Sequence, residues 1–165
     1  MISRSRQSLL ALTTGLVVAL CVTQALAATI VKVELSDQGA ATQMATGMTY
    51  GTPGLDISKA TMGIKTSTAT APAGIVTFQV TNTSKDTVHE MIVMYLTDPT
   101  KPLPYIDKDS KVDEDKAGDK GEVSELDPGK SGTLTVVLKP GKYILICNVA
   151  GHFAAGMWTP FEVTK

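Results

Sequence analysis

The sequence is poor in cysteine, in histidine and in net positive charge. Of its two cysteines, Cys21 lies in an apolar N-terminal run, which leaves Cys147 without a second cysteine for a disulfide in the rest of the chain. The 15 Lys and Arg residues face 16 Asp and Glu residues. This balance provides no basic surface of the kind that nucleic-acid-binding proteins use, so we expect no nucleic-acid partner. Two histidines in 165 residues also exclude any site that needs more than two imidazoles.

Residues 1–27 have the pattern of a secretory signal peptide. Two arginines precede an apolar run over residues 9–26, and Ala25 and Ala27 stand where a signal peptidase reads small residues. We expect cleavage after Ala27, a periplasmic location, and no stable membrane insertion of the mature chain. The alternative is a retained membrane anchor, because the run is borderline in length for a membrane-spanning helix.

Residues 28–165 are long enough for a single domain with its own core. Without the two leader arginines, 15 basic residues become 13 against 16 acidic ones, a net charge of −3. Exported proteins usually use cysteines in pairs. The unpaired thiol of Cys147 would be liable to oxidation in an oxidising compartment unless something binds it, and a metal ion could do so.

Short segments rich in β-branched and aromatic residues predict an all-β domain. Turns that contain Gly or Pro, such as Pro140-Gly141, separate these segments. This spacing favours a β-sandwich. The predicted strands cover residues 29–35, 75–81, 89–96, 132–138, 143–147 and 160–164.

Two stretches are less regular. Residues 37–65 form an N-terminal segment in which 43–48 could be a short helix with Met44 and Met48 on one face. Residues 98–127 are long and charged, with three prolines at the start. We interpret this second stretch as a solvated connection with one helical turn. The alternative is a docking surface for a basic partner.

One short stretch carries most of the chemistry. Cys147, His152 and Met157 follow one another in a Cys-x4-His-x4-Met pattern, and His89 begins a predicted strand far upstream. Each residue by itself is more often ordinary packing. Together they supply one thiolate, both available imidazoles and a thioether, the donor set of a mononuclear copper site for electron transfer. The small residues of the loop would let it return His152 and Met157 to the same ion.

The stretch YILICNVAGHFAAGMWTPFEV resembles the copper loop of the cupredoxins, and its spacing is most similar to rusticyanin and sulfocyanin. The resemblance implies a Greek-key β-sandwich that holds one copper ion, cycling between Cu+ and Cu2+. It also implies that His89, Cys147 and His152 are the equatorial ligands and Met157 is the axial one.

The sequence departs from that family pattern beside the ligands. Glu90 stands where Asn or Ser commonly braces the cysteine loop and donates toward the sulfur, and Ala150 stands where a Pro often precedes Gly-His. The sequence alone therefore does not determine which groups surround and orient the ligands. Met91 should lie on the same face as His89, as packing near the site or as an extra sulfur contact.

The resemblance implies a periplasmic carrier of single electrons, not an enzyme. We expect redox partners such as a cytochrome or a copper oxidase to dock near His152. The expected docking patch is apolar and consists of Ala150, Gly151, Phe153, Ala154 and Ala155. The alternative is copper resistance, storage or delivery, suggested by scattered methionines, namely Met44, Met48, Met62, Met91 and Met94. A copper enzyme is excluded because its catalytic centre would need further imidazoles.

Overall fold

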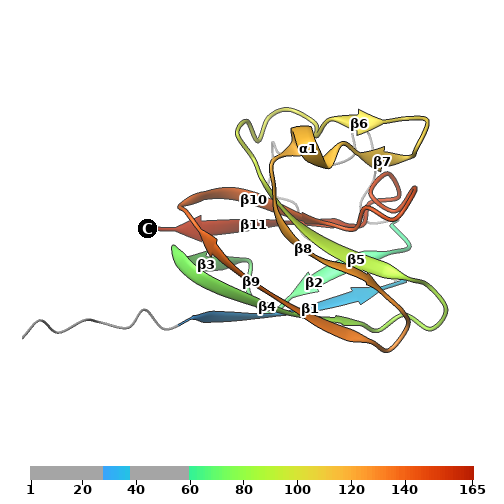
Figure 1. Cartoon of the computed structure of the whole chain (residues 1–165), viewed down its shortest axis with the longest axis horizontal. Coiled ribbons are helices and arrows are strands. Elements are labelled where there is room, and N and C mark those ends of the chain that lie inside the picture. Colours follow the sequence, from blue (N-terminus) through green and yellow to red (C-terminus); the bar gives the residue numbers. More distant parts are fainter. Residues whose placement is uncertain (1–27, 38–59) are drawn as a thin grey trace, which may run out of the picture.

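The computed structural model describes residues 28–37 and 60–165 (Figure 1). The predicted signal peptide and the predicted short helix at 43–48 lie outside these residues. Within the described part of the chain, no helix has the length and apolar character needed to span a membrane.

Two β-sheets pack face to face (Figure 1). The first has the strand order β2-β1-β4-β9 and the second the order β3-β11-β10-β5-β8. The first sheet consists of β1 (Thr29–Ser36), β2 (Gly63–Thr66), β4 (Gly74–Asn82) and β9 (Ser131–Leu138). The second consists of β3 (Thr70–Pro72), β5 (His89–Tyr95), β8 (Asp119–Leu126), β10 (Gly141–Ile146) and β11 (Trp158–Thr164). The predicted all-β sandwich is confirmed.

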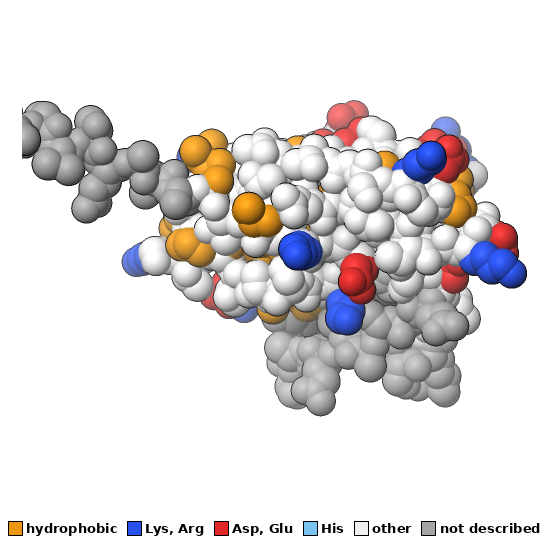
Figure 2. All heavy atoms as spheres, turned by 90° about the horizontal axis from the view of Figure 1, so that it is seen from below, with side chains coloured by type: hydrophobic (Ala, Val, Ile, Leu, Met, Phe, Trp, Pro, Cys, Tyr) orange, Lys and Arg blue, Asp and Glu red, His pale blue; other side chains and the backbone are white. Residues whose placement is uncertain are grey.

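The core lies between the sheets and follows the two-residue period of the strands. In β1 the buried residues are Val31, Val33 and Leu35, and β4 buries every second residue in the same way. The opposite face of this sheet is mostly polar. Figure 2 shows it with isolated hydrophobic side chains. The most exposed large hydrophobic residues in the described part of the chain are Val137 and Ile30.

Strand β5 is buried along almost its whole length because it is covered on both faces. One face joins the core between the sheets. The other face packs against a small layer formed by the hairpin of β6 (Tyr105–Ile106) and β7 (Lys111–Val112) and by the single-turn helix α1 (Glu114–Ala117). This layer lies above the five-stranded sheet in Figure 1.

The expectation for residues 98–127 is partly wrong. The helical turn is present as α1, which Asp113 caps at its N-terminus. However, residues 119–126 form β8, the edge strand beside β5, and not a solvated connection. The strand was hard to predict because Val123 is its one buried residue and most of the others are charged or small. Pairing with β5, and not local propensity, makes this segment a strand.

Candidate metal centre

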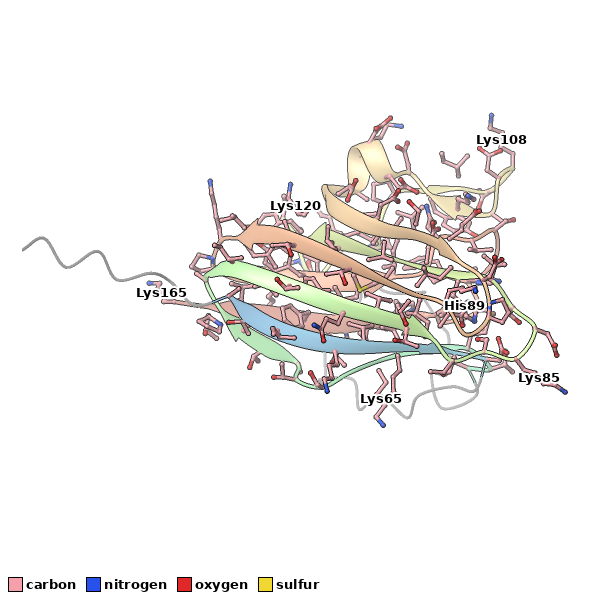
Figure 3. All side chains as sticks on the ribbon, turned by 60° about the horizontal axis from the view of Figure 1, so that its bottom comes forward. Lys65, Lys85, His89, Lys108, Lys120 and Lys165 are labelled. Carbon is pink, nitrogen blue, oxygen red and sulfur yellow. The ribbon has the colours of Figure 1, made fainter. Side chains whose placement is uncertain are left out.

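The four predicted ligands lie at one end of the sandwich. His89 is the first residue of β5, and Figure 3 shows it at the end of the molecule opposite Lys165. Cys147 directly follows β10, the strand that pairs with β5. His152 and Met157 lie in the loop that joins β10 to β11. The sandwich therefore brings His89 to the cysteine loop across two neighbouring strands.

The loop is closed by hydrogen bonds of its own backbone. The Cys147 N–H donates to the Met157 carbonyl at 3.0 Å, and the Met157 N–H donates to the His152 carbonyl at 3.0 Å. Gly151 and Gly156 have φ values of 85° and 95°, a left-handed conformation that glycine adopts without steric cost. These turns hold both loop ligands beside the end of β10.

Three ligand atoms converge. The Cys147 Sγ, one nitrogen of His89 and one of His152 all lie within 4.8 Å of one another. The two Nδ1 atoms are 3.2 Å apart, and the sulfur lies 3.8 Å from Nδ1 of His89 and 3.4 Å from Nδ1 of His152. Met157 is fully buried in the same core cluster as Cys147. The thiol and the two imidazoles of the predicted set thus meet at one place, and Met157 belongs to the same core cluster as the thiol.

These separations fit a metal ion. First-row ions such as zinc lie about 2.0 Å from imidazole nitrogen and about 2.3 Å from thiolate sulfur. With angles of about 120°, such an ion needs about 3.5 Å between the nitrogens and about 3.7 Å between nitrogen and sulfur. The observed triangle has nearly these edges, and its chemistry, two imidazoles and one thiolate with a thioether nearby, is that of a blue-copper site.

Burial sets the protonation of the metal-free site. Desolvation lowers the pKa of His89, although Asp37 opposes the effect, and it also lowers the pKa of His152. Both imidazoles are therefore neutral and have lone pairs available at neutral pH. Desolvation raises the pKa of the Cys147 thiol to about 11, against the opposing effect of backbone N–H groups. Metal binding at neutral pH must therefore displace a proton from this thiol.

Glu90 acts on the sulfur through its backbone. Its backbone N–H donates a hydrogen bond to the Cys147 Sγ at 3.5 Å. The backbone of Glu90 thus provides the hydrogen bond toward sulfur that the family pattern assigns to this position. The side chain is buried, and its Oε1 has no hydrogen-bond partner among residues 28–37 and 60–165. Burial raises the pKa of Glu90 to about 7, with Lys111 opposing the effect.

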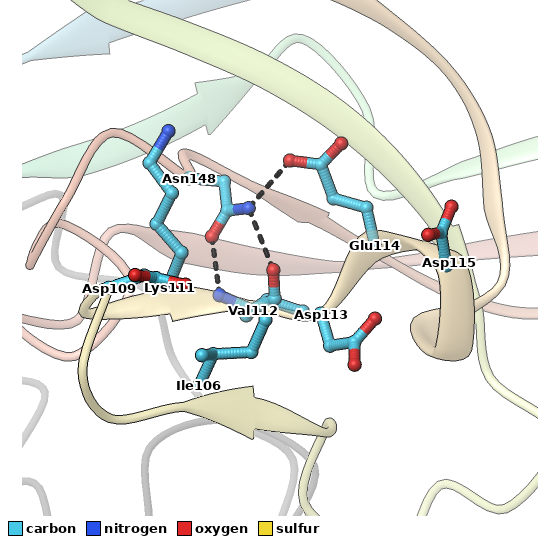
Figure 4. A pocket seen from close by; sticks show the side chains of 8 residues that line it. All are labelled: Ile106, Asp109, Lys111, Val112, Asp113, Glu114, Asp115 and Asn148. Carbon is cyan, nitrogen blue, oxygen red and sulfur yellow. Dashed lines mark hydrogen bonds between the residues drawn. The ribbon is translucent and has the colours of Figure 1, made fainter.

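Asn148 braces the cysteine loop from within. Its Oδ1 accepts from the Val112 N–H at 2.7 Å, and its Nδ2 donates to the Val112 carbonyl at 3.0 Å and to Glu114 at 2.7 Å (Figure 4). The Gly151 N–H adds a bond to the Ser110 carbonyl at 2.8 Å. Sequence reasoning missed Asn148. The available signal was a polar residue directly after the cysteine in a loop of small apolar ones.

The second nitrogen of His89 is also engaged. Its Nε2 lies 3.1 Å from Oδ1 of Asp37, the residue that follows β1. Sequence reasoning missed this contact as well. No local pattern signals it, because the two residues are 52 positions apart, one directly after β1 of the first sheet and the other in β5 of the second.

The surface around His152 differs in part from the expected patch. His152 is half-buried, whereas His89, Cys147 and Met157 are fully buried, so His152 forms the accessible edge of the site. Ala150 and Ala154 are exposed, as predicted.

Phe153 does not belong to the patch, contrary to expectation. It is 4% exposed and packs against the layer that contains Tyr105.

Met91 packs in the hydrophobic core, in the cluster that contains Cys147.

Comparisons with known proteins agree with this geometry. The family model described as "Sulfocyanin (SoxE) domain" matches residues 58–165, well over half of the chain. No curated protein sequence matches. Among solved structures, reduced auracyanin from the photosynthetic bacterium Roseiflexus castenholzii is 20% identical with a TM-score of 0.50, covering 84% of this chain and 98% of that one. Reduced rusticyanin is 18% identical with a TM-score of 0.50, covering 83% and 81%. At these identities the two structures show the fold alone.

The family match and the site together identify the cofactor. His89, Cys147, His152 and Met157 are arranged as a type 1 copper site, so the predicted cofactor, one copper ion, is confirmed. The match over residues 58–165 shows that this chain belongs to the sulfocyanin family, and with it to the cupredoxins.

Proposed function

We propose that this protein carries single electrons between redox partners in the periplasm through a type 1 copper site. The observation that carries the proposal is the convergence of one thiol sulfur and two imidazole nitrogens within 4.8 Å. His89, Cys147, His152 and Met157 would hold the ion. Copper bound there supplies a one-electron couple.

The surrounding residues suit that role by excluding water and resisting movement. His89, Cys147 and Met157 are each 0% exposed, and the loop is tied at both ends by backbone hydrogen bonds. A rigid ligand set changes little between two oxidation states, so an electron can enter and leave with little reorganisation. The half-buried His152, with exposed Ala150 and Ala154 beside it, offers a surface of small side chains on which a cytochrome or a copper oxidase could dock weakly.

Copper resistance, storage or delivery is the other function considered. It would favour methionines available at the surface for Cu(I). Of the methionines in the described residues, Met91, Met94 and Met157 are fully buried, and Met62 packs against the core. The remaining candidates, Met44 and Met48, lie outside the described residues. The electron carrier is therefore the function that we propose.

The optical spectrum tests the copper assignment. Adding Cu(II) to the purified metal-free protein should produce an intense visible band from thiolate-to-copper charge transfer. Cys147→Ser should abolish this band. Met91→Leu is the matched control, because it changes a buried sulfur in the same core cluster and should keep the band. A wild-type protein that stays colourless would contradict the type 1 assignment.

Two further measurements separate the two functions and the location. Fast electron self-exchange, with normal copper tolerance of a deletion strain, supports a carrier. Slow exchange with marked copper sensitivity supports copper handling. Recovery from the periplasmic fraction with an N-terminus at residue 28 supports export and cleavage, whereas an intact leader would contradict cleavage.

A further inference from the structure

His89 is held through both nitrogens of its ring. Nδ1 lies 3.8 Å from the Cys147 sulfur and 3.2 Å from Nδ1 of His152, so it faces the site. Nε2 lies 3.1 Å from Oδ1 of Asp37. A neutral imidazole carries one proton, and the nitrogen that binds a metal cannot be the protonated one. A proton at Nε2, donated to Asp37, leaves Nδ1 free to coordinate.

Asp37 is fixed from both sides of this contact. On its own side, Asp37 directly follows β1. The end of β1 is held in place because the Leu35 carbonyl accepts hydrogen bonds from the backbone N–H of Thr83 at 2.8 Å and from its hydroxyl at 2.9 Å. On the other side, its Oδ2 accepts from the Lys85 N–H at 3.3 Å, in the segment that leads into β5. The carboxylate therefore bridges the end of β1 to the start of the strand that carries His89.

The contact places a negative charge directly behind a predicted ligand. The His89 side chain is 0% exposed, and that of Asp37 is 36% exposed, so solvent reaches only the carboxylate end of the pair. A carboxylate that accepts the second N–H of a metal-binding imidazole fixes the ring orientation and raises the basicity of the ligating nitrogen. Greater basicity and the added negative charge both favour the higher oxidation state of a bound ion.

We propose that Asp37 is a positioning residue that acts through His89: it selects the tautomer with a free Nδ1, and it lowers the reduction potential of the site. The second half rests on the proposed copper function, whereas the first half concerns the metal-free protein alone. Asp37 thus joins the site as an outer partner, from the position that follows β1, a strand that contributes no ligand.

The experiment uses three variants of the purified protein. Asp37→Ala removes both the acceptor and the charge, and Asp37→Asn removes the charge while keeping an acceptor oxygen of the same reach. Asp86→Asn is the matched control, because Asp86 is an exposed acid of the same connecting segment. Circular dichroism confirms folding, and if Asp37→Ala fails to fold, the Asp37→Asn comparison still decides the effect on potential.

The first measurement needs no copper. Long-range 15N–1H NMR of the metal-free protein at neutral pH should show His89 with its proton on Nε2. Asp37→Ala should convert this single tautomer to a mixture, and Asp86→Asn should not. A single unchanged tautomer in Asp37→Ala would overturn the positioning role, whatever the fate of the copper assignment.

The second measurement is the midpoint potential of the copper-loaded protein. Loss of an outer partner typically weakens metal binding about 10- to 100-fold, and here the loss should be greater for Cu(II) than for Cu(I). A tenfold difference between the two oxidation states corresponds to about 59 mV for one electron. The potential of Asp37→Asn should rise by a shift of this order, well beyond that of Asp86→Asn. Equal shifts in these two variants would overturn the effect on potential, whereas a wild-type protein that takes up no copper would instead contradict the proposed function.

Discussion

The amide of Asn148 offers the sharpest test of how the copper loop is held. The side chain is 1% exposed and bridges the loop to Val112, a residue of β7 that is 2% exposed. We consider Asn148→Ala. This substitution leaves both the N–H and the carbonyl of Val112 without the partner that each has in the native protein, and it also removes the bond to Glu114 (Figure 4).

The size of the effect follows from which groups lose their partners. Each buried polar group left unsatisfied costs about 1–3 kcal/mol, whereas an exposed group recovers its hydrogen bond from water. Glu114 is half-buried and, together with Asp113 and Asp115, lines an open hollow of about 520 Å³, so water can solvate it. The two buried groups of Val112 dominate. We therefore expect the free energy of unfolding to fall by about 2–4 kcal/mol.

Urea denaturation of the metal-free protein measures this loss. The fluorescence of Trp158, the one tryptophan of the chain and 2% exposed, reports on the core cluster that also contains Val112. Thr135→Ala is the control. It removes a hydroxyl contact of 3.0 Å on the solvent face of the four-stranded sheet and should change stability by no more than about 0.5 kcal/mol. If Asn148→Ala matches this control, the amide does not brace the loop.

The remaining predictions concern the axial position and the buried acid. Met157→Leu should retain copper and raise the reduction potential, because the axial ligand tunes the site. Met94→Leu, in the other core cluster, should leave the potential unchanged, and an unchanged potential in both variants would show that Met157 is not a ligand. Burial raises the pKa of Glu90 from 4.5 to about 7, so the folded state binds the proton more tightly than the unfolded state. The contribution of Glu90 to the stability of the metal-free protein should therefore fall as the pH rises from about 4.5 to about 7, by at most about 3.4 kcal/mol at 1.36 kcal/mol per pKa unit. The lowered pKa values of His89 and His152 act in the opposite direction. In urea titrations at pH 5 and 8, the stability of the wild type relative to Glu90→Gln should be lower at pH 8 than at pH 5, and the same pH dependence in both proteins would contradict a raised pKa of Glu90.

The sequence alone was sufficient for the features that depend on local pattern. Alternating apolar residues such as Val31, Val33 and Leu35 predicted β1, because successive side chains of a strand point to opposite faces of the sheet. The loop from Cys147 to Met157 could be predicted as a tight return because its ligands lie at regular spacing among small residues. The scarcity of cysteine and histidine then left one thiol and two imidazoles as the available donors.

Which residues surround those donors could be determined only from the tertiary structure. Asp37 meets His89 across 52 positions, and Asn148 meets Val112 across 36, through contacts between different layers of the fold. Strand β8 forms because its backbone pairs with β5 at the edge of the sheet. Phe153 is buried because the layer containing Tyr105 covers it. Donor chemistry is a property of single side chains, so sequence suffices to list it. The tautomer, charge and rigidity of a site depend on neighbours that are distant in sequence, and these are settled when the sheets pack together.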